Sequence, residues 1–246
     1  MEIRGKVALV TGGAVRLGQA ISFGLAKEGV KVAVHYHHST QAAEETVAGI
    51  ESLGGRAVAV KGDFRRVSEI ESVVQNVVRL LGGLDILINN AADYFQTPLG
   101  QTDENQWDRL LDLNLKAPYF CAQAAADVMT RQKGGKIINI SDVAAISPWP
   151  DFIPYCASKA GLISVTKGLA KALAPDIQVN TIASGTVLMQ DDAPSNYRTK
   201  IAEQTLLKRI GSPADIVKAI IFLLRDGDYI TGEVLGVDGG RLLGGS

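Results

Sequence analysis

The sequence predicts a single α/β domain: a doubly wound parallel sheet of seven strands between two helical layers. Short apolar runs rich in Val and Ile alternate with amphipathic stretches of helical period along the whole chain. Alternation repeated this often is typical of parallel strands joined by right-handed crossovers. The first apolar run leads directly into a glycine-rich turn and a helix, which is typical of the first unit of such a sheet.

The predicted strands are apolar on both faces, as a sheet covered on both sides requires. In order they cover residues 6–11, 31–36, 57–61, 84–89, 135–140, 177–182 and 234–237. The predicted helices between them cover 16–28, 40–53, 67–80, 104–131, 153–173 and 213–225. Gly29, Gly54 and Gly82 end the first three helices.

No linker or repeat divides the chain, so residues 1–246 are expected to form one dinucleotide-binding domain. The polar stretch 184–208 follows a predicted strand, and we expect it to be a substrate-side loop with a short helix. Loops placed there often close over a ligand.

Composition excludes several functional classes. The formal net charge is −1, which gives no overall attraction to nucleic acid or to an anionic membrane. Cys121 and Cys156 form no CxxC pair, so neither a disulfide framework nor a structural metal site is expected. The sequence contains neither a signal-peptide pattern nor an apolar run of membrane-spanning length, and we expect a cytoplasmic location.

The turn after the first strand reads TGGAVRLG from Thr11 to Gly18. Glycines let the backbone approach a pyrophosphate, and the following helix N-terminus favours the negative charge. We therefore expect Gly12, Arg16 and Leu17 to contact a dinucleotide. Arg16 stands where such turns usually carry glycine, and its guanidinium can hold phosphate. A solvated residue at a helix start is the alternative, although a cation there opposes the helix dipole.

The second strand ends in a basic cluster: His35, Tyr36, His37, His38 and Ser39. An NAD site normally places an acidic residue here, whereas a basic group suits the 2′-phosphate of NADP. No acidic residue occurs between positions 31 and 41, so the sequence predicts NADPH. The alternatives are a His-rich surface turn and a metal site.

Other strand ends supply further expected cofactor contacts. Asp63 and Phe64 follow the third strand, and the Asp63 carboxylate is suited to accept a hydrogen bond from the adenine amine. Asn89 and Ala91 follow the fourth strand, where small residues leave room for the cofactor ribose. Asp and Asn are also ordinary turn formers at such positions.

Tyr155 and Lys159 lie four residues apart in the predicted helix 153–173, so both project from one face. A neighbouring ammonium stabilises tyrosinate and lowers the tyrosine pKa. Such a pair can pass a proton to or from a carbonyl or an imine.

These motifs together resemble the short-chain dehydrogenases/reductases. The similar segments are TGxxxRxG at 11–18, NNA at 89–91, YCASK at 155–159 and VDGG at 237–240. The resemblance implies a Rossmann-type fold, a nicotinamide cofactor and a Tyr155–Lys159 proton relay. It also implies that Asn114 holds a relay water, that Lys159 contacts the nicotinamide ribose, and that Ser141 and Gly185 touch the cofactor.

Two departures from that family resemble the pteridine reductases and dihydromonapterin reductases within it. Asp142 lies thirteen residues before Tyr155, where a serine is usual, and Arg16 replaces glycine beside the HYHHS turn. In those enzymes an aromatic residue after NNA stacks on the pterin, and Tyr94 has the matching place here. The resemblance implies substrate contacts from Arg16, Tyr94, Asp142 and Tyr155.

The sequence therefore predicts an NADPH-dependent reductase that delivers hydride to a C=N bond of a dihydropterin or dihydrofolate. A carboxylate near Tyr155 keeps the phenol protonated, which suits proton donation. The alternative role for Asp142 is that of a loop residue facing water, with Ser141 as the working hydroxyl. Reduction of a 3-oxoacyl thioester or a small ketone is the alternative activity. A nucleotide-sensing protein without turnover is a third hypothesis. Helices 104–131 and 153–173 carry apolar residues on more than one face, and the family resemblance implies that such helices pack into dimers and tetramers, so we expect a homotetramer.

Overall fold

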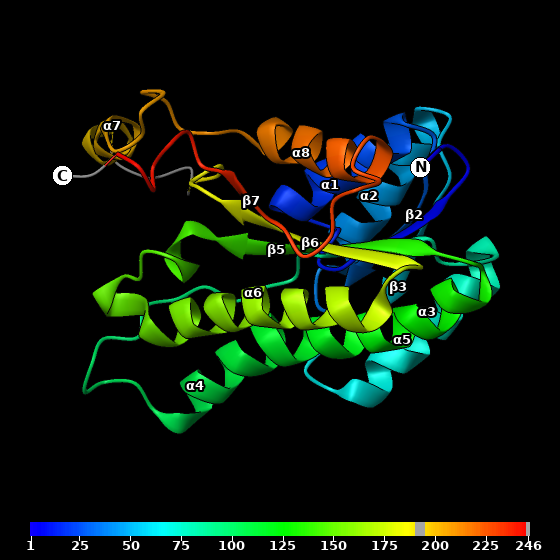
Figure 1. Cartoon of the computed structure of the whole chain (residues 1–246), viewed down its shortest axis with the longest axis horizontal. Helices are drawn as coiled ribbons and strands as arrows, with labels where there is room; N and C mark the ends of the chain where they lie inside the picture. The colour runs from blue at the N-terminus through cyan, green and yellow to red at the C-terminus, as the bar shows by residue number, and fades with distance from the viewer. Residues whose placement is uncertain (190–194, 245–246) are drawn as a thin grey trace.

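The computed structural model describes residues 1–189 and 195–244. Its centre is a seven-stranded parallel sheet in the order β3-β2-β1-β4-β5-β6-β7. The strands are β1 (Val7–Val10), β2 (Lys31–Tyr36), β3 (Ala57–Lys61), β4 (Ile86–Asn89), β5 (Gly135–Asp142), β6 (Ile177–Ser184) and β7 (Val234–Val237). The predicted fold class is confirmed (Figure 1).

Helices cover both faces of the sheet (Figure 1). The helices are α1 (Arg16–Lys27), α2 (Thr40–Ser52), α3 (Val67–Leu81), α4 (Glu104–Leu111), α5 (Ala117–Arg131), α6 (Ile153–Leu173), α7 (Ser195–Glu203) and α8 (Pro213–Arg225). Helices α1, α2 and α8 bury Ile21, Ile50 and Ile220 in one core, while α3 and α5 bury Val77 and Ala122 in the other. Burial of about 25 cal/mol per Å² of apolar surface makes these two layers the main stabilising term.

The strand order reverses between β1 and β4, and this switch point positions the ligand site. The buried Thr11 hydroxyl accepts hydrogen bonds from the backbone N–H groups of Asn90 and Ala91, each at 2.9 Å. The glycine-rich turn is thereby fixed to the end of β4. A ligand in the crevice meets both segments at once.

The predicted helix 104–131 is not one uniform helix. Its middle, Asp112–Lys116, is a π-helical turn between α4 and α5. Such bulges often occur at functional sites, and this one carries Asn114. Strand β5 also extends two residues beyond the predicted end, so that Asp142 belongs to the sheet. In the loop 184–208 the expected short helix is α7, and residues 190–194 lie outside the described residues.

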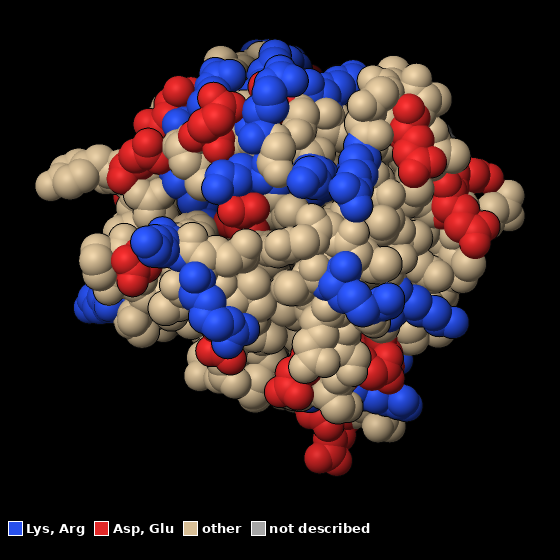
Figure 2. Space-filling model, turned by 90° about the vertical axis from the view of Figure 1, so that its right-hand side faces the viewer, with Lys and Arg blue, Asp and Glu red and all other residues tan. Residues whose placement is uncertain are grey.

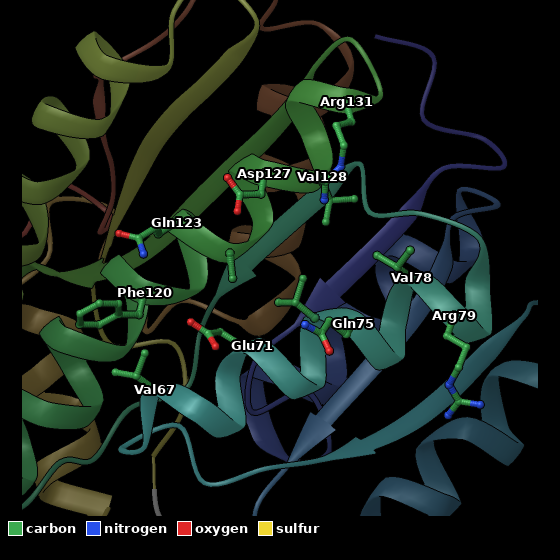
Figure 3. A pocket seen from close by; sticks show the side chains of 12 residues that line it. Val67, Glu71, Gln75, Val78, Arg79, Phe120, Gln123, Asp127, Val128 and Arg131 are labelled. Atoms are coloured by element: carbon green, nitrogen blue, oxygen red, sulfur yellow. The ribbon is translucent and has the colours of Figure 1, made fainter.

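Two further surface features lie outside the set of predicted site residues. Basic and acidic side chains are interspersed on the face seen in Figure 2, at the end of the molecule away from α7. A groove of about 390 Å³ runs between α3 and α5, lined by Val67, Gln75, Phe120 and Asp127 among others (Figure 3). None of the predicted site residues lines it. Across the described ranges, we find no helix with the length and apolarity that crossing a bilayer requires.

Candidate active site

Tyr155 and Asp142 meet where β5 ends and α6 begins. The phenolic hydroxyl of Tyr155 donates a hydrogen bond to Asp142 Oδ2 at 3.0 Å, while Asp142 Oδ1 accepts from the backbone N–H of Ala144 at 2.8 Å. Burial and then the charge of Asp142 raise the pKa of Tyr155 well above its ordinary value. Burial also raises the pKa of Asp142. Tyr155 is therefore a protonated phenol with a fixed acceptor.

Lys159 lies one helical turn after Tyr155 and is 4 % exposed. Its Nζ donates to the backbone oxygen of Ile140 at 2.9 Å and lies 5.8 Å from the centre of the Tyr155 ring. Burial lowers the pKa of Lys159 to about 8. An ammonium has three N–H donors, and within the described chain one acceptor is recorded for this Nζ. The remaining donors suit hydroxyl groups of a ligand.

Ser141 does not face Tyr155 as a working hydroxyl. Its Oγ donates to the backbone oxygen of Lys159 at 3.0 Å and is buried. The hydrogen-bond partner of Tyr155 is Asp142, not Ser141. This geometry supports the prediction for Asp142 over its alternative.

Asn114 ties the segment after β4 to the catalytic helix. Its Oδ1 accepts from the Asp93 N–H at 2.8 Å, and its Nδ2 donates to the Asp93 carbonyl at 2.9 Å and to Ser158 Oγ at 3.3 Å. The side chain is fully buried. Asn114 therefore fixes the backbone of Asp93, the residue before Tyr94. Its expected contact with a relay water remains a prediction.

An aromatic wall stands beside Tyr155. The Tyr94 ring stacks on Phe152 with centroids 4.7 Å apart and lies edge-on to Tyr155 at 5.0 Å. Trp149 packs edge-on to both Tyr94 and Phe152. Tyr94 is 57 % exposed, so this wall lies at the mouth of the site. It offers apolar contact area to whatever lies against Tyr155.

The glycine-rich turn has the shape that a pyrophosphate requires. Gly12 has φ +61°, and a Cβ there would lie 3.1 Å from the Cα of Ala91. Helix α1 starts at Arg16, and Val15 gives it no side-chain cap. The first N–H groups of α1 thus remain available to an anion. Leu17 follows in the first turn of α1 and packs against the core.

Arg16 adopts a strained backbone conformation, with φ 52°. Left-handed geometry costs a residue with a Cβ roughly 1–2 kcal/mol relative to glycine. Its side chain is exposed at the start of α1. A strained cation at a helix N-terminus is a costly arrangement, and a bound phosphate would compensate for it.

The sequence led us to expect that His35, His37 and His38 all face the 2′-phosphate of NADP. His35 does not. Its Nδ1 accepts from the Gly12 N–H at 3.1 Å, and its Nε2 lies 3.0 Å from the Gly62 oxygen. Its ring stacks on Phe64 at 3.7 Å, and burial lowers its pKa to about 4. Both ring nitrogens are therefore in use, which leaves none for a ligand. We correct its role, and that of the Phe64 ring, to support of the glycine-rich turn.

His37 and His38 directly follow β2 and are more accessible than His35. Their rings lie 3.6 Å apart, and His38 and Ser39 are exposed. Tyr36 is half-buried against the core. Among the residues that the structure describes, no group of three or more His, Cys, Asp or Glu side chains gathers in a metal-binding arrangement. His37, His38 and Ser39 remain the proposed 2′-phosphate contacts.

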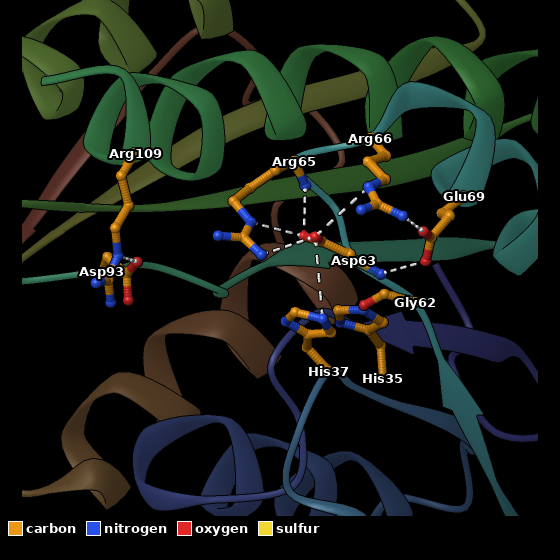
Figure 4. A network of polar contacts seen from close by, with 9 residues as sticks. All are labelled: His35, His37, Gly62, Asp63, Arg65, Arg66, Glu69, Asp93 and Arg109. Atoms are coloured by element: carbon orange, nitrogen blue, oxygen red, sulfur yellow. Dashed lines mark hydrogen bonds and ion pairs between the residues drawn. The ribbon is translucent and has the colours of Figure 1, made fainter. Parts of the chain in front are cut away.

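Asp63 is the centre of a charged network beside His37 (Figure 4). Arg65 donates two hydrogen bonds to its carboxylate, Nε to Oδ1 and Nη2 to Oδ2, each at 2.8 Å. His37 Nε2 lies 3.9 Å and Arg66 Nε 4.0 Å from Oδ2. The Arg65 hydrogen bonds lower the pKa of Asp63 to about 2. Sequence reasoning missed Arg65 and Arg66, although two arginines directly after an expected cofactor contact were a usable signal.

The remaining expected contacts lie at neighbouring strand ends. Asn89 donates to Asn139 Oδ1 at 2.8 Å, inside the sheet. Gly185 follows β6, and a Cβ there would lie 2.8 Å from the Cα of Asp238. Gly185 is therefore needed because its backbone passes too close to that of Asp238 to leave room for a side chain. The backbone of Ala91 also packs closely against Gly12.

Taken together, these residues fit a nicotinamide dinucleotide. The uncapped start of α1 suits the pyrophosphate, Asp63 the adenine end, and the buried Lys159 the ribose beside the reacting ring. The distances place a proton donor, Tyr155, next to that ammonium.

Comparison with known proteins identifies the family. The model of the family described as short chain dehydrogenase matches residues 6–198. The chain belongs to this family. It is therefore an oxidoreductase, as the sequence predicted.

Similar proteins include two 3-oxoacyl-acyl-carrier-protein reductases and a solved dehydrogenase/reductase structure. The 3-oxoacyl-acyl-carrier-protein reductase FabG of Staphylococcus aureus is 37% identical over 242 residues, which cover 97% of this chain and 98% of that protein. The 3-oxoacyl-acyl-carrier-protein reductase of Synechocystis sp. is 36% identical, with 97% of each chain covered. A dehydrogenase/reductase structure from Sinorhizobium meliloti 1021 superposes with a TM-score of 0.91 at 36% identity, covering 98% and 96% of the two chains.

The expectation of a pterin substrate is wrong. The Staphylococcus aureus and Synechocystis relatives, similar over nearly the whole chain, are named as 3-oxoacyl-acyl-carrier-protein reductases, not as pteridine reductases. A 3beta-hydroxysteroid dehydrogenase of Eggerthella lenta, 34% identical over 98% of this chain, is also named for a substrate other than a pterin. The features that indicated a pterin were Arg16, the HYHHS turn and Asp142. They lie at the expected phosphate site and beside the proton donor, and reduction of a carbonyl group requires both of these sites as well. The carbonyl alternative is the better supported reading.

Proposed function

We propose that this protein is an NADPH-dependent carbonyl reductase that converts a 3-oxoacyl thioester to the 3-hydroxyacyl thioester. The observation that carries the proposal is the protonated Tyr155 phenol, held 3.0 Å from Asp142 and beside the Lys159 ammonium. The relatives named as 3-oxoacyl reductases supply the substrate class.

In this mechanism Tyr155 is the general acid. NADPH supplies the hydride when it is bound. Tyr155 donates its proton to the substrate oxygen as negative charge develops there, and the nearby Lys159 ammonium stabilises the resulting phenolate. Asp142 orients the phenol before transfer, because its Oδ2 accepts a hydrogen bond from the hydroxyl group whose proton is later donated. The aromatic wall of Tyr94, Phe152 and Trp149 shields the reacting carbonyl from water.

The proposed cofactor contacts divide according to the part of NADPH that they meet. Gly12 and Leu17 border the pyrophosphate, while Arg16, His37, His38 and Ser39 hold the 2′-phosphate, with Arg66 close to them. Asp63 reads the adenine, and Asn89, Ala91, Ser141 and Gly185 border the path of the ribose and nicotinamide. Lys159 donates to the ribose hydroxyls.

The test is a direct assay of NADPH absorbance with acetoacetyl-CoA as the substrate. Turnover that depends on the thioester, together with release of 3-hydroxybutyryl-CoA identified by mass spectrometry, supports the proposal. A preference for NADPH over NADH supports the cofactor assignment. Tight NADPH binding without reduction of any 3-oxoacyl thioester would contradict the proposed activity and favour the nucleotide-sensing hypothesis.

We also propose a homotetramer. Several large apolar side chains are exposed on outer helices, and these include Tyr119 on α5, Ile153 on α6 and Phe222 on α8. Exposed apolar residues of this size are often covered in an assembly. Light scattering of the purified protein tests this, because a solution mass equal to one chain contradicts it.

A further inference from the structure

Arg241 is carried into the site by a fixed turn after β7. Asp238 Oδ1 accepts the Gly240 N–H and its Oδ2 accepts the Leu242 N–H, both at 2.9 Å. Gly239 and Gly240 have φ of +65° and +78°, which a side chain would strain. The turn therefore holds Arg241 in a defined place.

The Arg241 guanidinium bridges two sides of the candidate site. Its Nη1 donates to Thr186 Oγ1 at 2.9 Å, and Thr186 lies just beyond the carboxyl end of β6. Its Cζ lies 5.3 Å from the centre of the Trp149 ring. Trp149 in turn donates its backbone N–H to the sulfur of Cys156, the residue after Tyr155. The cation thus lies between the substrate-side loop and the aromatic wall.

Arg241 carries a charge that no carboxylate among the described residues pairs. Within residues 1–189 and 195–244, no carboxylate lies within 4.0 Å of its guanidinium, whereas Arg65 and Arg209 have partners at 2.8 Å. Arg241 nevertheless acts electrostatically on Asp142, the hydrogen-bond partner of Tyr155. Burial raises the pKa of Asp142, and the positive charge of Arg241 is one of the smaller effects that lower it. A guanidinium has five N–H donors, and one of them is recorded in a hydrogen bond here. The others can bind an oxygen acceptor.

We propose that Arg241 is a substrate-binding residue that holds the second oxygen of a 1,3-dicarbonyl substrate. This inference rests on the proposed function. In a 3-oxoacyl thioester the thioester oxygen lies two carbons from the ketone. With that oxygen on Arg241, the ketone oxygen faces the Tyr155 hydroxyl and the carbon chain lies along Trp149. A ketone without a second oxygen gains nothing from Arg241, so this residue sets specificity for dicarbonyl compounds.

The test compares two substrates in Arg241→Met, which keeps the length of the side chain but removes its charge and donors. For acetoacetyl-CoA we expect kcat/KM to fall about 10- to 100-fold, the range for loss of a hydrogen bond to a charged group, with most of the change in KM. For cyclohexanone, which has one oxygen, we expect a change of less than about threefold. Arg241→Lys keeps the charge without the planar fork and should recover part of the acetoacetyl-CoA activity.

A matched control in the same turn is Leu243→Ala, because Leu243 is 84% exposed. It should leave both substrates unchanged. Equal losses on both substrates in Arg241→Met would mean that Arg241 only supports the turn, and would overturn the inference. Failure of the wild-type protein to reduce acetoacetyl-CoA would instead overturn the proposed function, so the two failures are distinguishable.

Fluorescence gives a second readout that needs no turnover. The chain has two tryptophans, so Trp107→Phe leaves Trp149 as the only tryptophan, and its emission can be followed by exciting at a wavelength that tyrosine does not absorb. In that background, with NADP⁺ present, acetoacetyl-CoA should change the Trp149 emission with saturation. Adding Arg241→Met should weaken the apparent affinity about tenfold or more. Identical titrations with and without Arg241 would also overturn the inference.

Discussion

The Tyr155 hydroxyl donates its hydrogen bond to a carboxylate, Asp142 Oδ2 at 3.0 Å, at a position where the family usually has a serine. A hydroxyl group can both donate and accept, whereas an ionised carboxylate only accepts. The proton of Tyr155 is therefore directed at Asp142 until the substrate oxygen competes for it. Burial and the charge of Asp142 keep the phenol protonated, which is the form that donates a proton during reduction.

Asp142→Ser should separate orientation from charge. The serine hydroxyl can still accept from Tyr155, so reduction at neutral pH should change by less than about threefold or improve. Because Asp142 raises the pKa of Tyr155, its removal should move the alkaline limb of the kcat/KM profile to lower pH. Tyr155→Phe is the control and should lower the rate about 10²- to 10⁴-fold. An unchanged pH profile in Asp142→Ser would show that the carboxylate does not tune Tyr155.

Lys159→Met should raise stability while it lowers activity. Burial disfavours the ammonium and lowers the pKa of Lys159 to about 8, so at neutral pH the folded protein holds a costly buried charge. Removing it should raise the free energy of unfolding by about 1–3 kcal/mol, measured by urea denaturation at pH 7. Activity should fall at least about 100-fold.

The pH dependence gives the control for Lys159. Between pH 8 and 10.5 the unfolded chain binds more protons at this residue than the folded one, so the wild type should gain stability as pH rises through that window. Lys159→Met should lose this gain. If the variant is destabilised at neutral pH, the Ile140 contact outweighs the burial of charge.

The sheet and the catalytic pair could be predicted because both depend on local patterns. Alternating apolar runs determine the strands, and the spacing from Tyr155 to Lys159 puts both on one helix face whatever surrounds them. The π-helical turn at Asn114 could not be predicted, since its residues continue the helical pattern of their neighbours. Its position depends on contacts with Asp93 and Ser158, which only the folded chain brings together.

The role of His35 depends on which face of the sheet its side chain points to. Side chains alternate across β2, and Val34 faces the α1 core, so His35 points to the opposite, buried face and meets Phe64. The position of Arg241 in the site could not be predicted from local sequence. Arg241 lies almost a hundred residues from Trp149 in sequence, and no local pattern connects the two.

His35 should make the protein sensitive to acid. Its pKa falls from 6.5 to about 4 on folding, so the unfolded chain binds more protons between these values. Stability should be fully present above pH 6.5 and be lost as pH falls toward 4, by about 3 kcal/mol for this residue. His35→Asn keeps an acceptor for the Gly12 N–H and should reduce the slope of unfolding free energy against pH. His35→Phe, which has no acceptor, should weaken NADPH binding as well. Equal slopes in wild type and His35→Asn would assign the acid sensitivity to other groups.

Arg16→Gly should stabilise the protein and weaken its cofactor binding. Glycine relieves the left-handed strain at φ 52° and removes a cation from the start of α1, a gain of about 1 kcal/mol in thermal or urea unfolding. Loss of the guanidinium should weaken NADPH binding about tenfold or more and leave NADH binding nearly unchanged, measured by calorimetry. Lys133→Gly is the matched control, because Lys133 has φ 64° at the far end of α5. It should give a similar stabilisation without any change in the NADPH to NADH affinity ratio. If Arg16→Gly leaves that ratio unaltered, Arg16 does not read the 2′-phosphate, and the strain at this position has another cause.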